Sequence, residues 1–79
     1  MTIICRKGST GENVRNLQEM LNFLSAAPQP LIVDGLFGPK TDARVHEFQK
    51  ESHLSADGIV GPLTARALIA GVLEQVYSQ

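Results

Sequence analysis

The sequence Asp34-Gly35-Leu36-Phe37-Gly38-Pro39-Lys40-Thr41 returns further along the chain as Asp57-Gly58-Ile59-Val60-Gly61-Pro62-Leu63-Thr64. Each copy combines an Asp-Gly pair, two apolar residues and a Gly-Pro pair. Asp-Gly favours a tight turn, because the Asp side chain accepts hydrogen bonds from nearby backbone amides and Gly adopts positive φ without a Cβ clash. Gly-Pro favours the start of a helix, since the first helical residue needs no amide donor. The chain therefore uses one loop-and-helix unit twice.

Two copies are too few for a repeat array and indicate instead a small helical domain with internal pseudo-symmetry. The two units predict helices over 39–53 and 62–77. Before them, apolar residues at helical spacing predict a helix over 11–25, with Ser9 and Glu12, or Thr10 and Asn13, as its cap. We therefore expect an all-α fold, a small three-helix bundle, forming one domain over 1–79.

The same spacing predicts which side chains face the core. The first helix contributes Val14, Leu17, Met20, Leu21 and Leu24, the second Thr41, Val45 and Phe48, and the third Thr64, Ala67, Leu68, Gly71 and Val72. The apolar run 31–33 is expected to be a buried plug. Both histidines, His46 and His53, fall on the solvated side of the second helix.

Composition excludes several functions. The chain has 79 residues and a formal net charge of −1, its basic residues are mixed with acidic ones, and Trp is absent. Nucleic acid is therefore an unsuitable partner. A single cysteine, Cys5, excludes an internal disulfide and is expected to be a small buried residue. Neither a signal sequence nor a membrane span is visible, so the chain as given is expected in the cytoplasm, or at the cell envelope if it belongs to a longer exported or phage protein.

Catalytic chemistry finds little support. Asp34 and Asp57 are the only candidates for acid–base work, and each already suits a turn. The two histidines lack further metal ligands, and the Gly8 to Gly11 stretch lacks the Lys-Ser/Thr of a phosphate loop. We expect no enzyme activity, no metal and no cofactor.

The chain resembles the peptidoglycan-binding domains of three-helix type that accompany bacterial and phage cell-wall hydrolases. The similarity covers about 6–68, and its matching residues include Arg6-Lys7-Gly8, Leu17-Gln18, Phe48-Gln49 and both Asp-Gly-x-x-Gly-Pro loops. It leaves 69–79 as a C-terminal helix extension. Gly38 and Gly61 are expected to be structural, because a side chain there would crowd the approach of the loop to the helix.

The resemblance implies a non-catalytic accessory module that binds the peptide or glycan of murein and brings a hydrolase to the wall. Free amides and helix dipoles at the two helix starts suit carbonyls and carboxylates. The residues at matching positions are Asp34, Gly35, Phe37, Gly38, Thr41, Asp57, Gly58, Val60, Gly61 and Thr64. Phe37 and Val60 are equally suited to the core. The alternative is the same fold used as a protein-interaction module or small adaptor without murein binding.

A second apolar stripe, made of Ile69, Leu73, Val76 and Tyr77, lies on another side of the third helix. A helix buries two stripes only if something covers both. One possible cover is the N-terminal segment Ile3-Ile4-Cys5. The other is a second protein surface, either a homodimer or a partner such as a hydrolase.

Overall fold

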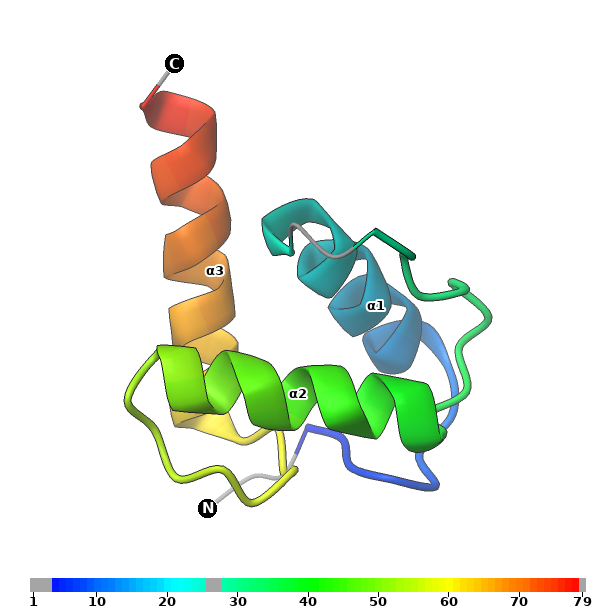
Figure 1. The fold of residues 1–79 in the computed structure, drawn as a ribbon. Helices are drawn as coiled ribbons and strands as arrows, with labels where there is room; N and C mark the ends of the chain where they lie inside the picture. Colours follow the sequence, from blue (N-terminus) through cyan, green and yellow to red (C-terminus); the bar gives the residue numbers. More distant parts are fainter. Residues whose placement is uncertain (1–3, 26–27, 79) are drawn as a thin grey trace.

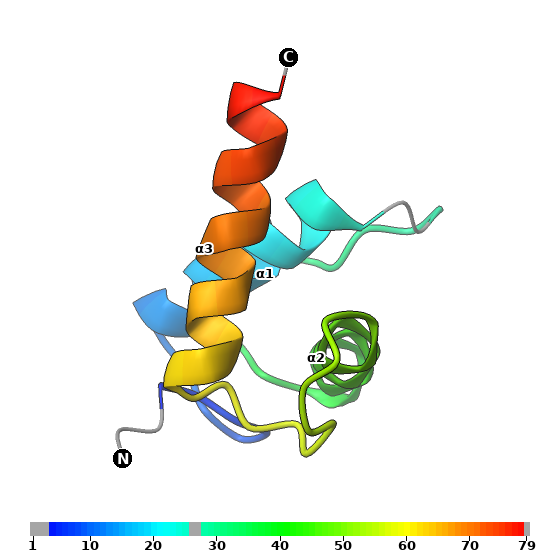
Figure 2. The same ribbon diagram turned by 90° about the vertical axis from the view of Figure 1, so that its left-hand side faces the viewer.

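The fold consists of three helices joined by loops. The computed structural model describes residues 4–25 and 28–78. The helices are α1 (Glu12–Leu24), α2 (Pro39–Glu51) and α3 (Pro62–Tyr77), and α1 contacts both of the others (Figure 1). α2 runs crosswise to α3, and Figure 2 shows α2 almost end-on beside the upright α3. The predicted all-α, three-helix fold is confirmed.

The hydrophobic core gathers around α1. Its buried apolar residues are Cys5, Val14, Leu17, Leu21, Leu31, Phe37, Val45, Val60 and Leu68. The stripe predicted for α1 is confirmed, since Met20 and Leu24 are partly buried against this core. Cys5 is buried as expected, and burial raises the pKa of its thiol.

The first described residues pair with both loops. Cys5 and Val60 form an isolated antiparallel bridge, and the Val60 amide donates to the Cys5 carbonyl over 2.9 Å. Further on, the Phe37 amide donates to the Ser9 carbonyl, and the Gly8 amide donates to the Phe37 carbonyl, both over 3.0 Å. One short segment therefore joins the two loop-and-helix units.

The predicted cap of α1 is wrong. The N-cap is Gly11, which has φ 112° and makes no side-chain cap hydrogen bond, while Ser9 Oγ accepts a bond from the Arg6 amide. The Gly11 amide donates to the Gly35 carbonyl over 3.0 Å. The segment thus meets α1 while paired with the first loop, a conformation that glycine tolerates and a Ser or Thr N-cap does not.

The predicted plug over 31–33 is only partly correct. Leu31 is buried, but Ile32 is 76% exposed. The Asn22 side chain explains the difference: its Nδ2 donates to the Leu31 carbonyl over 2.9 Å, and its Oδ1 accepts from the Leu31 amide over 2.7 Å. This two-way bond fixes Leu31 against α1, and the next side chain faces away.

The C-terminal half of α3 extends beyond the other helices (Figure 1). The stripe of Ile69, Leu73, Val76 and Tyr77 is between 49% and 81% exposed. Its proposed cover by Ile4 and Cys5 is wrong, because the two residues pair with Val60 instead; Ile3 lies outside the described residues. Of the predicted core face of α3, Thr64 and Leu68 are buried, whereas Ala67, Gly71 and Val72 are half-buried.

Candidate functional site

The first loop is held by a glutamine from the preceding helix. Gln18, buried on α1, donates through Nε2 to Asp34 Oδ1 at 3.1 Å, to the Leu36 carbonyl at 3.0 Å and to Thr41 Oγ1 at 3.1 Å. Its Oε1 accepts from the amides of Asp34 and Gly35. One side chain thereby joins α1, the loop and the first turn of α2.

The second loop repeats this arrangement one helix later. Gln49 on α2 donates to Asp57 Oδ1 at 3.1 Å, to the Ile59 carbonyl at 3.0 Å and to Thr64 Oγ1 at 3.2 Å. Its Oε1 accepts from the Gly58 amide at 3.0 Å. Each glutamine therefore fastens the loop that begins the next helix.

The Asp-Gly turns form as predicted. Asp34 Oδ1 accepts from the Leu36 amide, and Asp57 Oδ1 accepts from the Ile59 amide, both at 2.9 Å. These backbone bonds are the largest cause of a lowered pKa at both carboxylates, and the glutamine amide lowers it further. Both carboxylates are thus held ionised by structural bonds, which is the opposite of what a general acid requires.

The glycines of the two turns meet their surroundings differently. Gly35 and Gly58 have φ 76° and 77°, which favours glycine. A Cβ on Gly35 would lie 3.1 Å from Arg15 Cγ, whereas a Cβ on Gly58 would lie 2.6 Å from His46 Cε1. The sequence predicted that His46 lies on the solvated side of its helix. In the structure His46 is half-buried, with its ring next to Gly58 of the second loop.

The prediction that a side chain at Gly38 would crowd the loop is wrong. A Cβ there meets nothing within 4 Å, and its φ of −101° is open to any residue. Gly61 has nearly the same φ, −100°, but is buried. The two equivalent glycines thus differ in burial, since Gly38 is half-buried.

Most of the predicted binding residues are internal. Phe37 and Val60 lie in the core, and Thr41 and Thr64 are buried with their hydroxyls bound by the glutamines. The other buried members of the predicted set are Gly35, Gly58 and Gly61; Gly38 is half-buried, and Asp34 and Asp57 are exposed. The structure gathers the ten residues into two separate groups, one around each loop.

Each loop borders a shallow pocket. The first has a volume of about 400 Å³ and is lined by Gln18, Leu31, Ile32, Asp34, Leu36, Gly38, Pro39, Lys40 and Thr41. The second, of about 300 Å³, is lined by Leu54, Ser55, Asp57, Ile59, Gly61, Pro62, Leu63 and Thr64. Six lining positions correspond between the two pockets, from the Asp to the Thr of the repeated unit. The internal repeat therefore creates two related concave surfaces.

The pockets lie at the starts of α2 and α3, where no side-chain hydrogen bond caps the described helices. Pro39 has no amide hydrogen, and the Asp42 amide already donates to Gly38 at 2.9 Å. The amides of Lys40 and Thr41 have no intrahelical acceptor. The first pocket thus combines amides that lack an intrahelical acceptor, the positive end of a helix and a lysine.

Two other kinds of site are absent from the described part of the chain. Across residues 4–25 and 28–78, no three His, Cys, Asp or Glu side chains group as metal ligands would. Over the same ranges, no helix has the length and apolar character needed to cross a membrane.

Comparison with known proteins identifies the family. Residues 10–68 match the model of the family described as "Putative peptidoglycan binding domain". The chain belongs to this family. It is 47% identical over 58 residues to the zinc D-Ala-D-Ala carboxypeptidase of Streptomyces albus G, covering 73% of this chain and 23% of that protein. It is 38% identical over 68 residues to a probable N-acetylmuramoyl-L-alanine amidase of Bacillus licheniformis, covering 86% and 19%.

Solved structures of related proteins share the fold of this peptidoglycan-binding domain. An L,D-transpeptidase from Xylanimonas cellulosilytica has a TM-score of 0.81 at 41% identity, covering 90% of this chain and 34% of that one. A peptidoglycan-binding protein from Clostridioides difficile, in complex with glutamine hydroxamate, has a TM-score of 0.74 at 44% identity, covering 81% and 39%. The chain spans about a fifth of the length of the two enzymes above.

Gln18 and Gln49 are the residues whose role sequence reasoning missed. Both were visible as part of the repeat, since Leu17-Gln18 and Phe48-Gln49 precede the two loops. Their distance from the loop differs, at 16 residues for Gln18 and Asp34 and 8 for Gln49 and Asp57. This unequal spacing hides the equivalence until the helices are placed in space.

Proposed function

We propose that this chain is a non-catalytic module that binds peptidoglycan and thereby concentrates a cell-wall hydrolase, attached or separate, on the wall. The observation that carries the proposal is the family match over residues 10–68, which includes both loop-and-helix units. The related carboxypeptidase and amidase support it, because in both the matching segment is a minor part of a much longer enzyme. The place of action is accordingly the cell envelope.

We assign the main contact with the wall to the first pocket. A peptide stem offers carbonyls and carboxylates, which the start of α2 and the Lys40 ammonium would bind. Ile32 and Leu36, 76% and 56% exposed, form an apolar wall beside these donors. Of the predicted residues, Asp34, Gly38 and Thr41 border this pocket, whereas Phe37 supports it from the core.

The second pocket suits a less charged part of the same ligand. Leu63, which is 68% exposed, stands where the first pocket has Lys40. The pocket still has an uncapped helix start, but its walls are mainly apolar, with Ile59 and Leu54 beside Leu63. An acetyl group or an alanine methyl would fit such a surface. The two pockets therefore divide the recognition of charge and of apolar groups.

A sedimentation assay with insoluble murein sacculi tests the proposal. The wild-type chain should co-sediment with sacculi, with an affinity of about micromolar to millimolar for so shallow a site. Lys40→Glu should weaken binding, whereas Lys50→Glu, an equal charge change on an exposed residue outside both pockets, should leave it unchanged. Binding should survive a chelator. Failure of the folded wild-type chain to co-sediment, beside an unrelated protein of similar charge, would contradict the proposal.

A second candidate function is protein interaction, and the exposed stripe of Ile69, Leu73, Val76 and Tyr77 favours it. Four half-exposed or fully exposed apolar side chains on one helix form the kind of patch that partners cover. None of the four residues lines either loop pocket, and the C-terminal end of α3, where the stripe ends, extends past the other helices (Figure 1). Wall binding and partner binding are therefore compatible in one module.

A further inference from the structure

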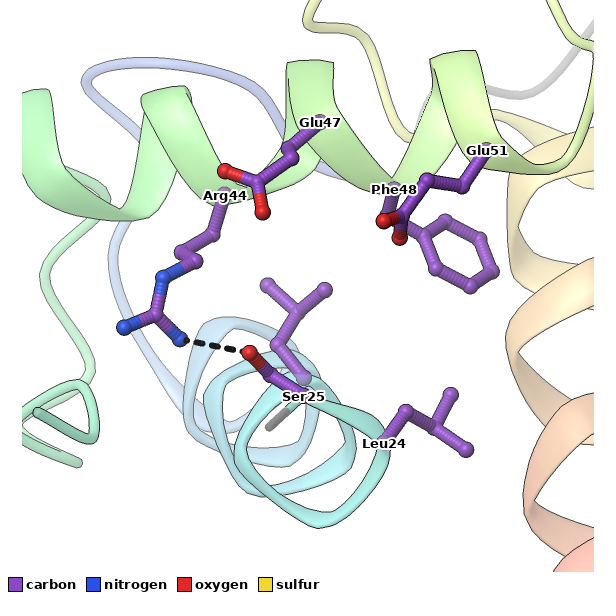
Figure 3. A pocket seen from close by; sticks show the side chains of 7 residues that line it. Leu24, Ser25, Arg44, Glu47, Phe48 and Glu51 are labelled. Carbon is purple, nitrogen blue, oxygen red and sulfur yellow. Dashed lines mark hydrogen bonds between the residues drawn. The ribbon is translucent and has the colours of Figure 1, made fainter. Parts of the chain in front are cut away.

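A groove with positive and negative side chains along its α2 side runs between the C-terminal parts of α1 and α2. We call it the α1–α2 groove. Its first part has a volume of about 400 Å³ and is lined by Leu21, Leu24, Ser25, Arg44, Glu47, Phe48 and Glu51 (Figure 3). It shares no lining residue with either loop pocket. The groove is therefore a separate concave surface, which neither the sequence pattern nor the repeated unit predicts.

The three charged side chains of the groove all come from α2 and follow one another along its edge. Figure 3 shows the Arg44 guanidinium beside Ser25, with the carboxylates of Glu47 and Glu51 further along α2. Arg44 donates to Ser25 Oγ at 3.4 Å and to the Gln29 carbonyl, which fixes its position. The ion pairs within the described ranges join Arg15 with Glu12 and His46 with Asp42. Within these ranges the three groove charges thus have no ionic partner.

The floor between these charges is apolar. Leu21 is buried, and Leu24 and Phe48 are half-buried and in contact with the core. In Figure 3 the ring of Phe48 and the side chain of Leu24 lie below the two carboxylates. Such a surface suits methylene groups. A suitable ligand carries a cation and an anion on neighbouring atoms, at the end of an aliphatic chain.

We propose that the α1–α2 groove binds a free α-amino acid end, in which one carbon carries both an ammonium and a carboxylate. The ammonium would lie between Glu47 and Glu51, and the carboxylate would face Arg44 through charge-assisted hydrogen bonds. Peptidoglycan supplies this group wherever a diamino acid of the diaminopimelate type is not cross-linked. In this form the inference rests on the proposed function and specifies it: the module senses uncross-linked stem peptides.

The groove continues along α3, where a longer ligand finds room. Its second part, of about 610 Å³, shares Leu24, Phe48 and Glu51 with the first. Small residues of α3, namely Ala67, Ala70 and Gly71, form its wall. A Cβ on Gly71 would lie 3.3 Å from Leu24 Cδ1, so a larger residue would push into the floor. The peptide that carries the amino-acid end would extend along this part.

Titration by ¹⁵N NMR tests the groove with small probes. Addition of meso-diaminopimelate should shift the amides of Ser25, Arg44, Glu47, Phe48 and Glu51 with millimolar affinity. Cadaverine, which has only ammonium groups, and pimelate, which has only carboxylates, should bind at least about tenfold more weakly, since each loses one set of charged hydrogen bonds. Equal shifts from all three probes, or shifts that map elsewhere, would overturn the proposal.

Charge variants locate the contact. The double change Glu47→Gln and Glu51→Gln should weaken diaminopimelate binding at least about tenfold. Because both residues are exposed, the variant should fold as the wild type does. Glu19→Gln, an exposed carboxylate of α1 outside the groove, is the matched control and should bind normally. Unchanged affinity in the folded double variant would refute the assignment.

Two further measurements separate this inference from the proposed function. A stem peptide ending in a free diaminopimelate should bind more tightly than the free amino acid, and acylation of its side-chain ammonium should abolish the gain. If sacculi fail to retain the chain but diaminopimelate shifts the groove, the proposed function fails and the groove stands as an amino-acid site. If sacculi retain the chain but diaminopimelate shifts none of the groove amides, the groove proposal fails and the proposed function stands.

Discussion

Gln18 Nε2 lies 3.1 Å from Asp34 Oδ1, while Gln18 Oε1 accepts a hydrogen bond from the Asp34 amide at 3.1 Å. The side chain of one residue thus binds both the backbone and the carboxylate of the other. Gln18 Nε2 also donates to the Leu36 carbonyl and to Thr41 Oγ1. The side chain therefore supplies the hydrogen bonds that hold the backbone of the loop in place. Gln49 does the same one helix later, which makes the two glutamines the most informative positions for mutation.

Replacing either glutamine by alanine should strongly destabilise the fold. Gln18→Ala leaves the buried Thr41 hydroxyl and the Leu36 carbonyl without this donor, and Gln49→Ala does so for Thr64 and its loop. We expect a loss of about 2–4 kcal/mol in the free energy of unfolding for each. Urea unfolding followed by circular dichroism measures it. Asn16→Ala, an exposed change on the same helix as Gln18, is the control, and a similar loss there would argue against a special role.

Replacing each of three loop glycines by alanine should lower the free energy of unfolding by an amount that depends on the atoms around that glycine. Gly58→Ala combines a φ of 77° with a 2.6 Å approach to His46, so we expect a loss of about 2–3 kcal/mol. Gly35→Ala should cost less, because its nearest contacts are longer, at 3.1 Å to Arg15 Cγ and 3.3 Å to the Gly11 carbonyl oxygen. Gly38→Ala should cost at most about 1 kcal/mol. Thermal melting gives the order. In the His46→Ala background part of the Gly58→Ala loss should disappear, and its persistence in full would locate the strain in the backbone.

Acid should destabilise the fold through the two turn carboxylates. The folded-state pKa of Asp34 and Asp57 is lowered from the usual 3.8, so their contribution is present above that value and is lost as the pH falls through the lowered pKa. Stability should therefore decline below about pH 4. Urea midpoints between neutral and acid pH measure this decline. Asp34→Asn and Asp57→Asn should make it shallower, whereas Asp42→Asn, outside the turns, should change the slope less.

The exposed stripe on α3 should tolerate charge. Leu73→Glu and Val76→Glu place carboxylates on side chains that are 49% and 52% exposed, so the pair should lower the free energy of unfolding by no more than about 1–2 kcal/mol. Leu68→Glu, on the buried side of the same helix, should prevent folding. Calorimetry measures both effects. If the double variant unfolds as Leu68→Glu does, the stripe is part of the core. If it stays folded and a wild-type dimer becomes a monomer, the stripe is an interface.

Much of the fold could be predicted because its signals are local. Pro39 and Pro62 begin α2 and α3, and the Asp-Gly turns form from bonds within three residues. The stripe of α1 follows from its period alone. The failures have a common cause. The cap of α1 and the position of Ile32 depend on contacts with distant parts of the chain, namely Gly35 and Asn22.

The candidate sites were harder to predict than the fold. Sequence matching includes Phe37 and Val60 among the ligand-binding candidates, but only the packing shows that both are buried. In each loop the glutamine binds one side, and the pocket forms on the side that remains open. The sequence does not show which side that is. The α1–α2 groove depends on how two helices cross, since Arg44 and Ser25 meet only there. Neither the open side of a loop nor the crossing of two helices produces a periodic pattern in the sequence.

The pairing of the first described residues with Val60 also decides how the domain carries mechanical tension. Three backbone hydrogen bonds join Ile4 and Cys5 to Val60, which lies two residues before the start of α3. The described chain begins near the base of α3 and ends at its far tip (Figure 1). A pull applied at these two ends therefore runs through the three bonds and along α3. While these bonds hold, α1, α2 and the first loop lie outside the loaded path, so the first pocket, which is proposed to make the main contact with the wall, keeps its shape under force.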